Sequence, residues 1–448
     1  MVKDLTKGTP WRVLLNLSLP MLISVAFQQM YSIADSMIAG NYAGKFALDE
    51  VGASYPVTMI FLSVATGASA GASVIAARLF GAKELKNLKT AINTALISFT
   101  AVGLILTVLG LILCAPILEL LGTPKDIMPN SDAYLRIYIL GLVFLFLYNA
   151  CNGIFTALGD AKTPLYFLIA SSVGNVLLDL LFVLCFGMGV AGVAWATFIV
   201  QGIAAVLSAI TLIKRVAAIK SEKPRIFSKR ALFQITRIAV PSILQGSFVS
   251  VGNLFIQSLV NFYGLTEMGV IGGFSAAIKL NTFTLTCFST LSNSISNFAA
   301  QNMGAGCFDR VKKGVSSASL MSFIVAIPFA VTLFFFGGEL TALFATEGGE
   351  NVMRTGRVFL QIVSPFYLVI GVKIIIDGVM RGLGIMKPFV IATCLDLVLR
   401  VAFAYILSPV FGSDGIWLSW PIGWMLALFV DIFFYWYYII KEKAIKLH

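Results

Sequence analysis

The sequence has little charge, almost no histidine and no paired cysteines. Charged residues fill 12% of 448 positions and hydrophobic residues 58%, whereas charged residues fill about a quarter of an ordinary soluble domain. The only histidine is the last residue, His448, and the six cysteines lie singly, without metal-ligand spacing. We therefore expect neither a zinc site nor a disulfide framework, and too little polar surface for a water-soluble fold.

Long apolar runs take the place of the missing charge. They recur at about 20 to 30 residues, enough to cross a hydrocarbon core about 30 Å thick, and helices satisfy their backbone groups in lipid. The first run is too long for a cleavable signal peptide and leads to Asp35 instead of a cleavage site. The sequence predicts an all-α polytopic membrane protein with twelve transmembrane helices, near 13–39, 52–78, 91–121, 132–158, 163–187, 189–213, 236–263, 268–301, 314–345, 354–382, 387–411 and 415–440.

The net charge of +11 has an uneven distribution along the chain. Basic residues gather at both ends and in alternate loops, above all in the stretch from Lys214 to Arg237, while the loops between are acidic or sparsely charged. The positive-inside rule then places both termini in the cytoplasm, which an even number of spans allows. The basic excess is a topology signal, so we expect no nucleic-acid partner and a location in the plasma (inner) membrane.

The two halves of the chain resemble each other. Pro20 corresponds to Pro241, the segment AARLFGAKE to AAQNMGAGC, and Pro164 to Pro388, all at offsets of 221 to 225 residues. Six spans per half give parallel repeats, which are related by a pseudo-two-fold axis along the membrane normal and bind substrates between them. The sequence predicts two six-helix bundles, 1–213 and 236–448, joined by a cytoplasmic basic linker, 214–235. This design is typical of alternating-access transporters.

Charged residues inside the predicted spans need a reason, because each costs at least about 2.5 kcal/mol to insert. In the second half, Lys373, Asp377 and Arg381 share a helix face at four-residue spacing, as do Asp396 and Arg400. Residues at this spacing can neutralise each other, so we interpret these five as structural ion pairs, with substrate or ion binding as the alternative. Lys279 has no such local partner.

In the first half, Asp35 and Asp179 lie without a nearby basic residue, and Asn175 shares a helix face with Asp179. An unpaired carboxylate in lipid holds a proton or binds a cation. The three residues therefore indicate a proton relay or a small hard-cation site with oxygen ligands. The alternative is that the carboxylates reach a water-filled cavity or cap a broken helix.

These residues belong to a set of motifs that resembles the multidrug and toxic compound extrusion (MATE) family, within the wider group that also holds lipid-linked oligosaccharide flippases. The resemblance covers nearly the whole chain and includes the DinF-like prokaryotic branch. Its motifs are the Pro20 segment leading to Asp35 and Gly40, Arg78 with Gly81-Ala82, Leu158-Gly159-Asp160 with Thr163-Pro164, Asn175 to Asp179, Gly189-Val190-Ala191-Gly192 and Gln301 to Gly306.

The resemblance implies export of amphipathic, cationic organic compounds in exchange for H⁺ or Na⁺. It also implies a cation site in the amino-terminal lobe at Asp35, Asn175, Asp179 and Thr197, the last on resemblance alone. Another branch of the family uses a glutamate in the seventh helix, but here no carboxylate follows until Glu267, beyond that span. We therefore expect coupling in the amino lobe.

A substrate cleft between the lobes is the remaining expected site. Our candidates for its wall are Phe27, Gln28, Met30, Tyr31, Tyr138 and Lys279. We expect no cofactor other than the coupling ion, and a protein that functions as a monomer. The rival function is a flippase or exporter of lipid-linked or anionic substrates, which predicts a cleft rich in cations such as Lys279, Lys373, Arg381 and Arg400. A membrane-embedded enzyme is the rival from another class, and we do not expect it because no phosphate loop, nucleophile elbow or HExxH motif occurs.

Overall fold

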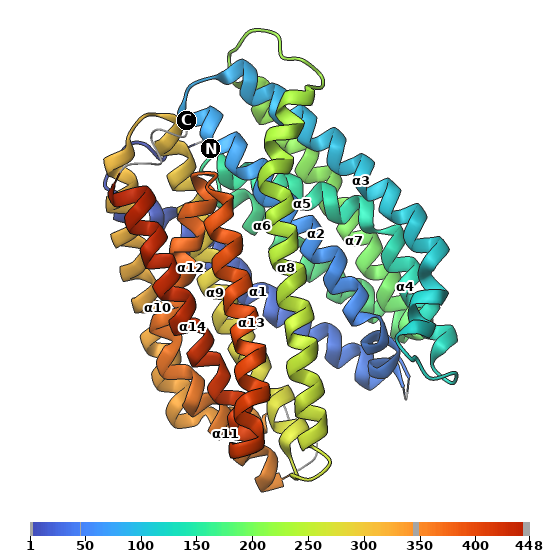
Figure 1. The fold of residues 1–448 in the computed structure, drawn as a ribbon. Coiled ribbons are helices and arrows are strands. Elements are labelled where there is room, and N and C mark those ends of the chain that lie inside the picture. The colour runs from blue at the N-terminus through green and yellow to red at the C-terminus, as the bar shows by residue number, and fades with distance from the viewer. Residues whose placement is uncertain (1–2, 45, 344–348, 442–448) are drawn as a thin grey trace. The chain divides into compact units, whose positions relative to one another are not determined.

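The computed structural model describes residues 3–44, 46–343 and 349–441, and over these residues the chain forms helices and no strand (Figure 1). This confirms the predicted all-α fold. The reason is the one that the composition gives: long apolar segments in lipid satisfy their backbone hydrogen bonds internally.

The first half of the chain contains six helical segments, of which the fourth is broken. Leu140 ends one helix and Leu142 begins the next, and the two helices meet at an angle of 45°. The segments are α1 (Pro10–Tyr42), α2 (Ala47–Gly81), α3 (Leu85–Leu120), α4 (Met128–Leu140) with α5 (Leu142–Ala157), α6 (Lys162–Leu180) with the π-helix η1 (Leu181–Cys185), and α7 (Gly189–Ala218).

The second half repeats this order. Its fourth segment is again interrupted, here by a short 3₁₀ turn that contains Pro365. The segments are α8 (Lys229–Tyr263), α9 (Val270–Gly304), α10 (Phe308–Ala342), α11 (Gly349–Val363) and α12 (Tyr367–Gly382) flanking η2 (Ser364–Phe366), α13 (Met386–Phe411), and α14 (Ser413–Tyr435) with the π-helix η3 (Trp436–Ile440).

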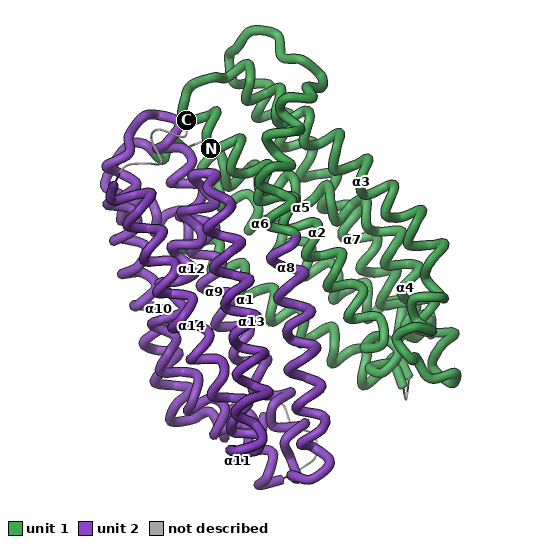
Figure 2. Tube along the Cα trace, in the orientation of Figure 1, with its two compact units in different colours: residues 1–5, 19–243 green, residues 6–18, 244–448 purple. Residues whose placement is uncertain are grey.

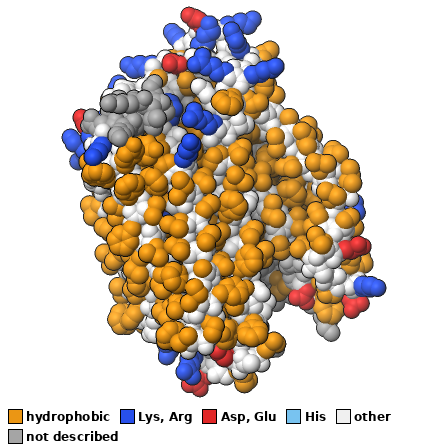
Figure 3. Space-filling view, in the orientation of Figure 1, with side chains coloured by type: hydrophobic (Ala, Val, Ile, Leu, Met, Phe, Trp, Pro, Cys, Tyr) orange, Lys and Arg blue, Asp and Glu red, His pale blue; other side chains and the backbone are white. Residues whose placement is uncertain are grey.

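Eleven of these segments, counting the bent α4–α5 pair as one, are long and apolar enough to cross a membrane. The remaining one, α9, has 35 residues and so the required length, but it carries buried polar side chains such as Asn281 and Asn297 along its course. The twelve predicted spans thus correspond to twelve helical segments in the described parts of the chain. Hydrophobic side chains cover the visible flanks of the helices (Figure 3), as expected of a multi-pass membrane protein.

Helix packing repeats between the halves as the sequence does. In the first half α5 packs on α2, α3 and α7, and α6 packs on α7. In the second half the equivalent helix α12 packs on α9, α10 and α14, and α13 packs on α14. Even the interruption of the fourth segment recurs, since Gly141 and Pro365 lie 224 residues apart, within the predicted range of offsets.

The chain divides into two compact units (Figure 2), residues 1–5 with 19–243 and residues 6–18 with 244–448. The predicted boundaries at 213 and 236 do not coincide with this division, because α1 and α8 each contribute to both units. In α8 the reason is that its first part packs closely on α2 and its second part on α13, as the contacts of two glycines show. A Cβ added at Gly67 of α2 would lie 2.7 Å from the backbone nitrogen of Ile243, and one at Gly252 would lie 1.8 Å from Leu397 of α13.

The loop between the halves is shorter than the predicted linker 214–235, because α7 continues to Ala218 and α8 begins at Lys229. It is fixed to the start of α3. The backbone N–H groups of Arg225 and Ser228 donate to the hydroxyls of Thr90 and Thr94, both at 3.1 Å.

A surface ion pair adds to this attachment of the loop. Lys86 of α3 lies 2.7 Å from Glu222, and this hydrogen bond and charge lower the pKa of the Glu222 carboxyl. The segment is therefore docked on α3 rather than freely extended. Lys and Arg side chains gather at the end of unit 1 that carries it (Figure 3).

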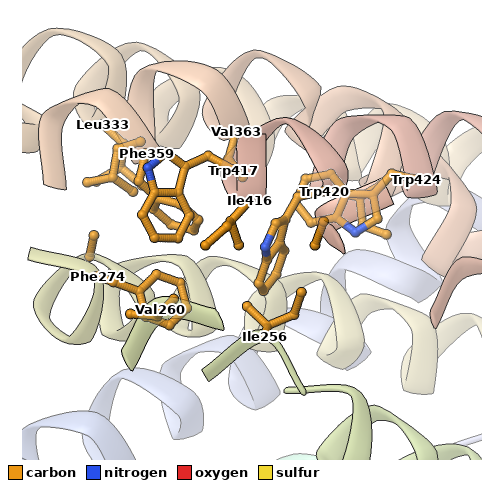
Figure 4. Packing of buried hydrophobic residues seen from close by; sticks show 14 of the residues in the cluster. Ile256, Val260, Phe274, Leu333, Phe359, Val363, Ile416, Trp417, Trp420 and Trp424 are labelled. Atoms are coloured by element: carbon orange, nitrogen blue, oxygen red, sulfur yellow. The ribbon is translucent and has the colours of Figure 1, made fainter. Parts of the chain in front are cut away.

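The core of unit 2 is rich in aromatic side chains (Figure 4). Trp417 stacks on Phe274 at a centroid distance of 5.0 Å and meets Phe359 edge to face at 5.3 Å. Trp420 and Trp424 lie one helical turn apart in contact at 5.9 Å. Each such pair contributes about 0.5–1.5 kcal/mol beyond area burial, so these side chains of α9, α11 and α14 hold the unit together.

Candidate functional site

A small apolar cluster in unit 1 brings three helices together. Ile38 and Ala39 of α1 pack against Val183 of η1 and Val193 of α7, with Val176 of α6 beside them. Each polar residue of the candidate site lies within about one turn of a member of this cluster, since an α-helix has 3.6 residues per turn. The apolar contacts therefore fix where the polar side chains meet.

Asn175 is the centre of the polar contacts and is 3% exposed. The amide orientation that satisfies both of its ends places Nδ2 at 2.8 Å from Asp179 Oδ2 and 3.1 Å from Tyr31 Oη, donating to both. The amide oxygen accepts from the backbone N–H of Thr197 at 3.1 Å. The side chain of Thr197 lies 3.3 Å from the same end of the amide. One buried amide thus joins α1, α6 and α7.

The carboxyl groups of Asp35 and Asp179 lie close enough to each other to interact directly. Ionised carboxylates are acceptors only, so a proton or a cation would be needed to join the two groups. Asp179 is completely buried, and one oxygen of each carboxyl has no hydrogen-bond partner within the described chain. The site can therefore offer these two oxygens, with the Thr197 hydroxyl close by, to a proton or a hard cation.

Two tyrosines complete the surroundings of the carboxyl pair. Tyr31 of α1 accepts a hydrogen bond from Asn175 and lies close to Thr197, and Tyr134 of α4 lies within electrostatic range of both aspartates. Over the described residues no group of three or more His, Cys, Asp or Glu side chains could hold a metal ion. The oxygen set here is instead two carboxyls with amide and hydroxyl groups, which suits a proton or Na⁺.

The predicted cleft residues fall into two groups. Phe27, Gln28, Met30 and Lys279 are exposed, Met30 to 66%, whereas Tyr31 and Tyr138 are partly buried. Tyr31 has its hydroxyl in the polar cluster, so its place is at the candidate coupling site. The assignment of the other five residues, Phe27, Gln28, Met30, Tyr138 and Lys279, to the cleft stays a prediction.

Among the predicted ion pairs of unit 2, one is formed directly. Lys373 Nζ lies 2.8 Å from Asp377 Oδ2, and both side chains are buried. Arg381 donates to Asn293 Oδ1 at 2.7 Å and interacts electrostatically with Asp377.

Asp396 and Arg400 do not come within ion-pair distance in the described chain. The Arg400 guanidinium instead lies over the ring of Trp420, 4.4 Å from its centroid. Its Nε atom and the Oδ1 atom of Asp396 have no hydrogen-bond partner there. The aromatic neighbour on α14, which helical spacing alone does not reveal, takes the place of the predicted carboxylate.

Tyr134 and Asp431 are not among the residues predicted from the sequence. Tyr134 is four residues before the predicted cleft residue Tyr138 and shares its helix face. Asp431 lies in the apolar stretch ALFVDIFFYW of α14 and is 1% exposed. An ionisable residue inside a span is a functional candidate by default, so the signal for Asp431 was present in the sequence.

Comparison with known proteins gives a consistent match. The model of the MatE family matches residues 20–181 and 241–406, one stretch in each half. The chain is 29% identical over 445 residues to the "Probable multidrug resistance protein YpnP" of Bacillus subtilis (strain 168), across 99% of this chain and 98% of that protein. It is 27% identical over 419 residues to the "FAD transporter" of Shewanella oneidensis, across 92% and 91%.

Among solved structures, a MOP superfamily transporter from Pyrococcus furiosus has the same fold. It matches with a TM-score of 0.92 at 23% identity, across 99% of this chain and 98% of that one. The similarity thus extends over the whole helical architecture and over both halves.

Proposed function

Because this chain belongs to the MatE family of membrane transporters, we propose that it is a secondary active exporter that exchanges organic compounds for H⁺ or Na⁺. The proposal includes alternating access between the two halves, a location in the plasma membrane with both termini in the cytoplasm, and function as a monomer. Transport then needs no catalytic residues and no cofactor beyond the coupling ion.

The observation that carries the coupling proposal is the pairing of the Asp35 and Asp179 carboxyl groups, each with one oxygen that has no hydrogen-bond partner in the described chain. Two carboxylates cannot both stay ionised in such contact without a cation. A site of this kind binds an ion when it faces the outside and releases it when it faces the cytoplasm. Since Asp35 lies on α1 while Asp179 lies on α6, a movement of α1 would alter the affinity for the ion.

We propose that the substrates are amphipathic organic cations. One relative is described as a multidrug resistance protein, and Phe27 and Met30 offer exposed apolar surface on α1. In unit 2 the Lys373 ammonium is bonded to Asp377 and the Arg400 guanidinium is stacked on Trp420. These two cations are thus occupied within the bundle, which weighs against an anionic substrate.

An anionic substrate is the second candidate, because another relative is described as an FAD transporter. FAD carries phosphate groups, so such a substrate would need exposed cations. Lys279 on α9 is exposed and is the residue through which this alternative can be tested.

The decisive experiment is gradient-driven uptake into everted vesicles. Cells expressing wild type, Asp35→Asn, Asp179→Asn or the control Asp309→Asn supply the vesicles, and Na⁺ and pH gradients are imposed separately. The control makes the same chemical change at a side chain that is 88% exposed. Uptake of a fluorescent organic cation should follow one gradient in wild type and control and disappear in the other two variants.

Two other outcomes are informative. No gradient-driven uptake of the cation by folded wild-type protein would contradict the cation-exporter proposal. Uptake of FAD that is lost in Lys279→Met, with no cation uptake, would support the anionic substrate instead.

A further inference from the structure

Unit 2 contains a buried carboxyl that the coupling site in unit 1 does not use. Asp431 of α14 is 1% exposed, its Oδ2 atom has no hydrogen-bond partner within the described residues, and no ion pair involves it there. It lies well inside the span Ser413–Ile440. An ionised carboxylate buried without a partner is far more costly than a neutral one.

The charged groups that interact electrostatically with Asp431 lie on two neighbouring helices. They are Lys373 and Asp377 of α12 and Asp396 of α13. Lys373 is the only cation among them, and its ammonium group donates to Asp377 Oδ2 at 2.8 Å. Asp431 therefore faces two other carboxyls and one ammonium group that is already bonded.

The other cations of this region have partners elsewhere. The Arg400 guanidinium lies over the ring of Trp420, and Arg381 donates to Asn293. Neither is among the groups that face Asp431. A lysine ammonium has three N–H donors, so the bond of Lys373 to Asp377 leaves two of them for another acceptor.

From this arrangement we infer that Asp431 is a proton-binding site of unit 2, with Lys373 as the counter-ion of its deprotonated form. When the O–H bond of Asp431 breaks, the proton passes to water and Lys373 donates a second hydrogen bond, now to Asp431. The Asp377 carboxylate neutralises the charge of the ammonium group and so favours the protonated form of Asp431. The site goes beyond the proposed function, because it does not depend on which compound is transported.

Infrared difference spectroscopy can test the inference on the purified full-length protein in an ester-free detergent at neutral pH. A protonated carboxyl gives a C=O band that is separate from the bands of a carboxylate and shifts in D₂O. We expect Asp431→Asn to lose the signal of one protonated carboxyl relative to wild type. The control Asp309→Asn, at an exposed position, should lose none.

Two further variants test the role of Lys373, with opposite expected signs. Asp377→Asn frees the ammonium group to pair with Asp431, so the acid signal of Asp431 should disappear although Asp431 is unchanged. Lys373→Met leaves Asp377 without its partner, so the signal should grow by one protonated carboxyl.

An unchanged acid signal in folded Asp431→Asn would overturn the proton site. A retained Asp431 signal in Asp377→Asn would overturn the role of Lys373. If Asp431→Asn does not fold, as judged by size-exclusion chromatography, the spectra of Asp377→Asn and Lys373→Met decide the question. These measurements use neither substrate nor gradient, so they stand or fall separately from the transport experiment.

Discussion

Removing one partner of the buried Lys373–Asp377 pair should have unequal effects, depending on which partner is removed. Both side chains are buried, to 3% and 6% exposure. In Lys373→Met, three carboxyls lose the one cation that they share, and breaking a buried pair in this way costs about 3–5 kcal/mol. In Asp377→Asn, Lys373 still faces Asp396 and Asp431, so the loss should be nearer about 1.5 kcal/mol, the lower value for a hydrogen bond to a charged group.

The free energy of unfolding in detergent can be followed by tryptophan fluorescence. Trp417, Trp420 and Trp424 lie in the core of the same unit, so they report on its unfolding. The control is Lys86→Met, the same substitution in a pair whose side chains are 51% and 78% exposed, which should cause no measurable change. Equal destabilisation by Lys373→Met and Asp377→Asn, or a larger effect of Asp377→Asn, would refute the reasoning.

Three further predictions concern the coupling site, the helix packing and the loop. Asn175→Leu removes the hydrogen-bond donor to Asp179. It should lower the initial rate of gradient-driven transport by roughly tenfold or more, because a hydrogen bond to a charged group contributes about 1.5–3 kcal/mol. An unchanged rate would mean that Asn175 has only a packing role. Gly71→Leu should destabilise the protein by about 1–3 kcal/mol, because even a Cβ at this position would lie 2.6 Å from the carbonyl oxygen of Ile235. The control Gly52→Ala places a Cβ in open space and should not destabilise the protein. Thermal unfolding of the two variants measures the difference. The double variant Thr90→Val, Thr94→Val removes the two hydroxyl acceptors of the loop 219–228. Trypsin should therefore cleave this loop faster than it does in the control Thr100→Val, because the Thr100 hydroxyl bonds only within its own helix.

Several features of the fold and of the site could be predicted from particular residues. Asp35 and Asp179 lie in apolar runs with no basic residue at helical spacing, and an unpaired intramembrane carboxylate points to an ion or a proton. Asn175 precedes Asp179 by four residues and so shares its helix face. The structure brings these three residues together, as a common site requires. Thr197 gave no signal of its own, because a threonine in a helix commonly bonds to its own backbone.

Other features depend on contacts between helices that are distant in sequence. The four-residue spacing correctly indicated Lys373 with Asp377, but Arg400 pairs with the ring of Trp420 on α14 instead of with Asp396. The polar surroundings of Asp431 arise because α12, α13 and α14 pack together. No local spacing contains this information.

The sequence by itself determined that the chain lies in a lipid bilayer, that it is helical and that its two halves repeat. These follow from the cost of charge and of unsatisfied backbone groups in lipid, which acts on every segment separately. Only the tertiary structure decided which intramembrane charges meet and which remain without a partner. That outcome depends on apolar packing between helices, such as that of Ile38, Val183 and Val193, because this packing fixes the distances between polar side chains that are far apart in the chain.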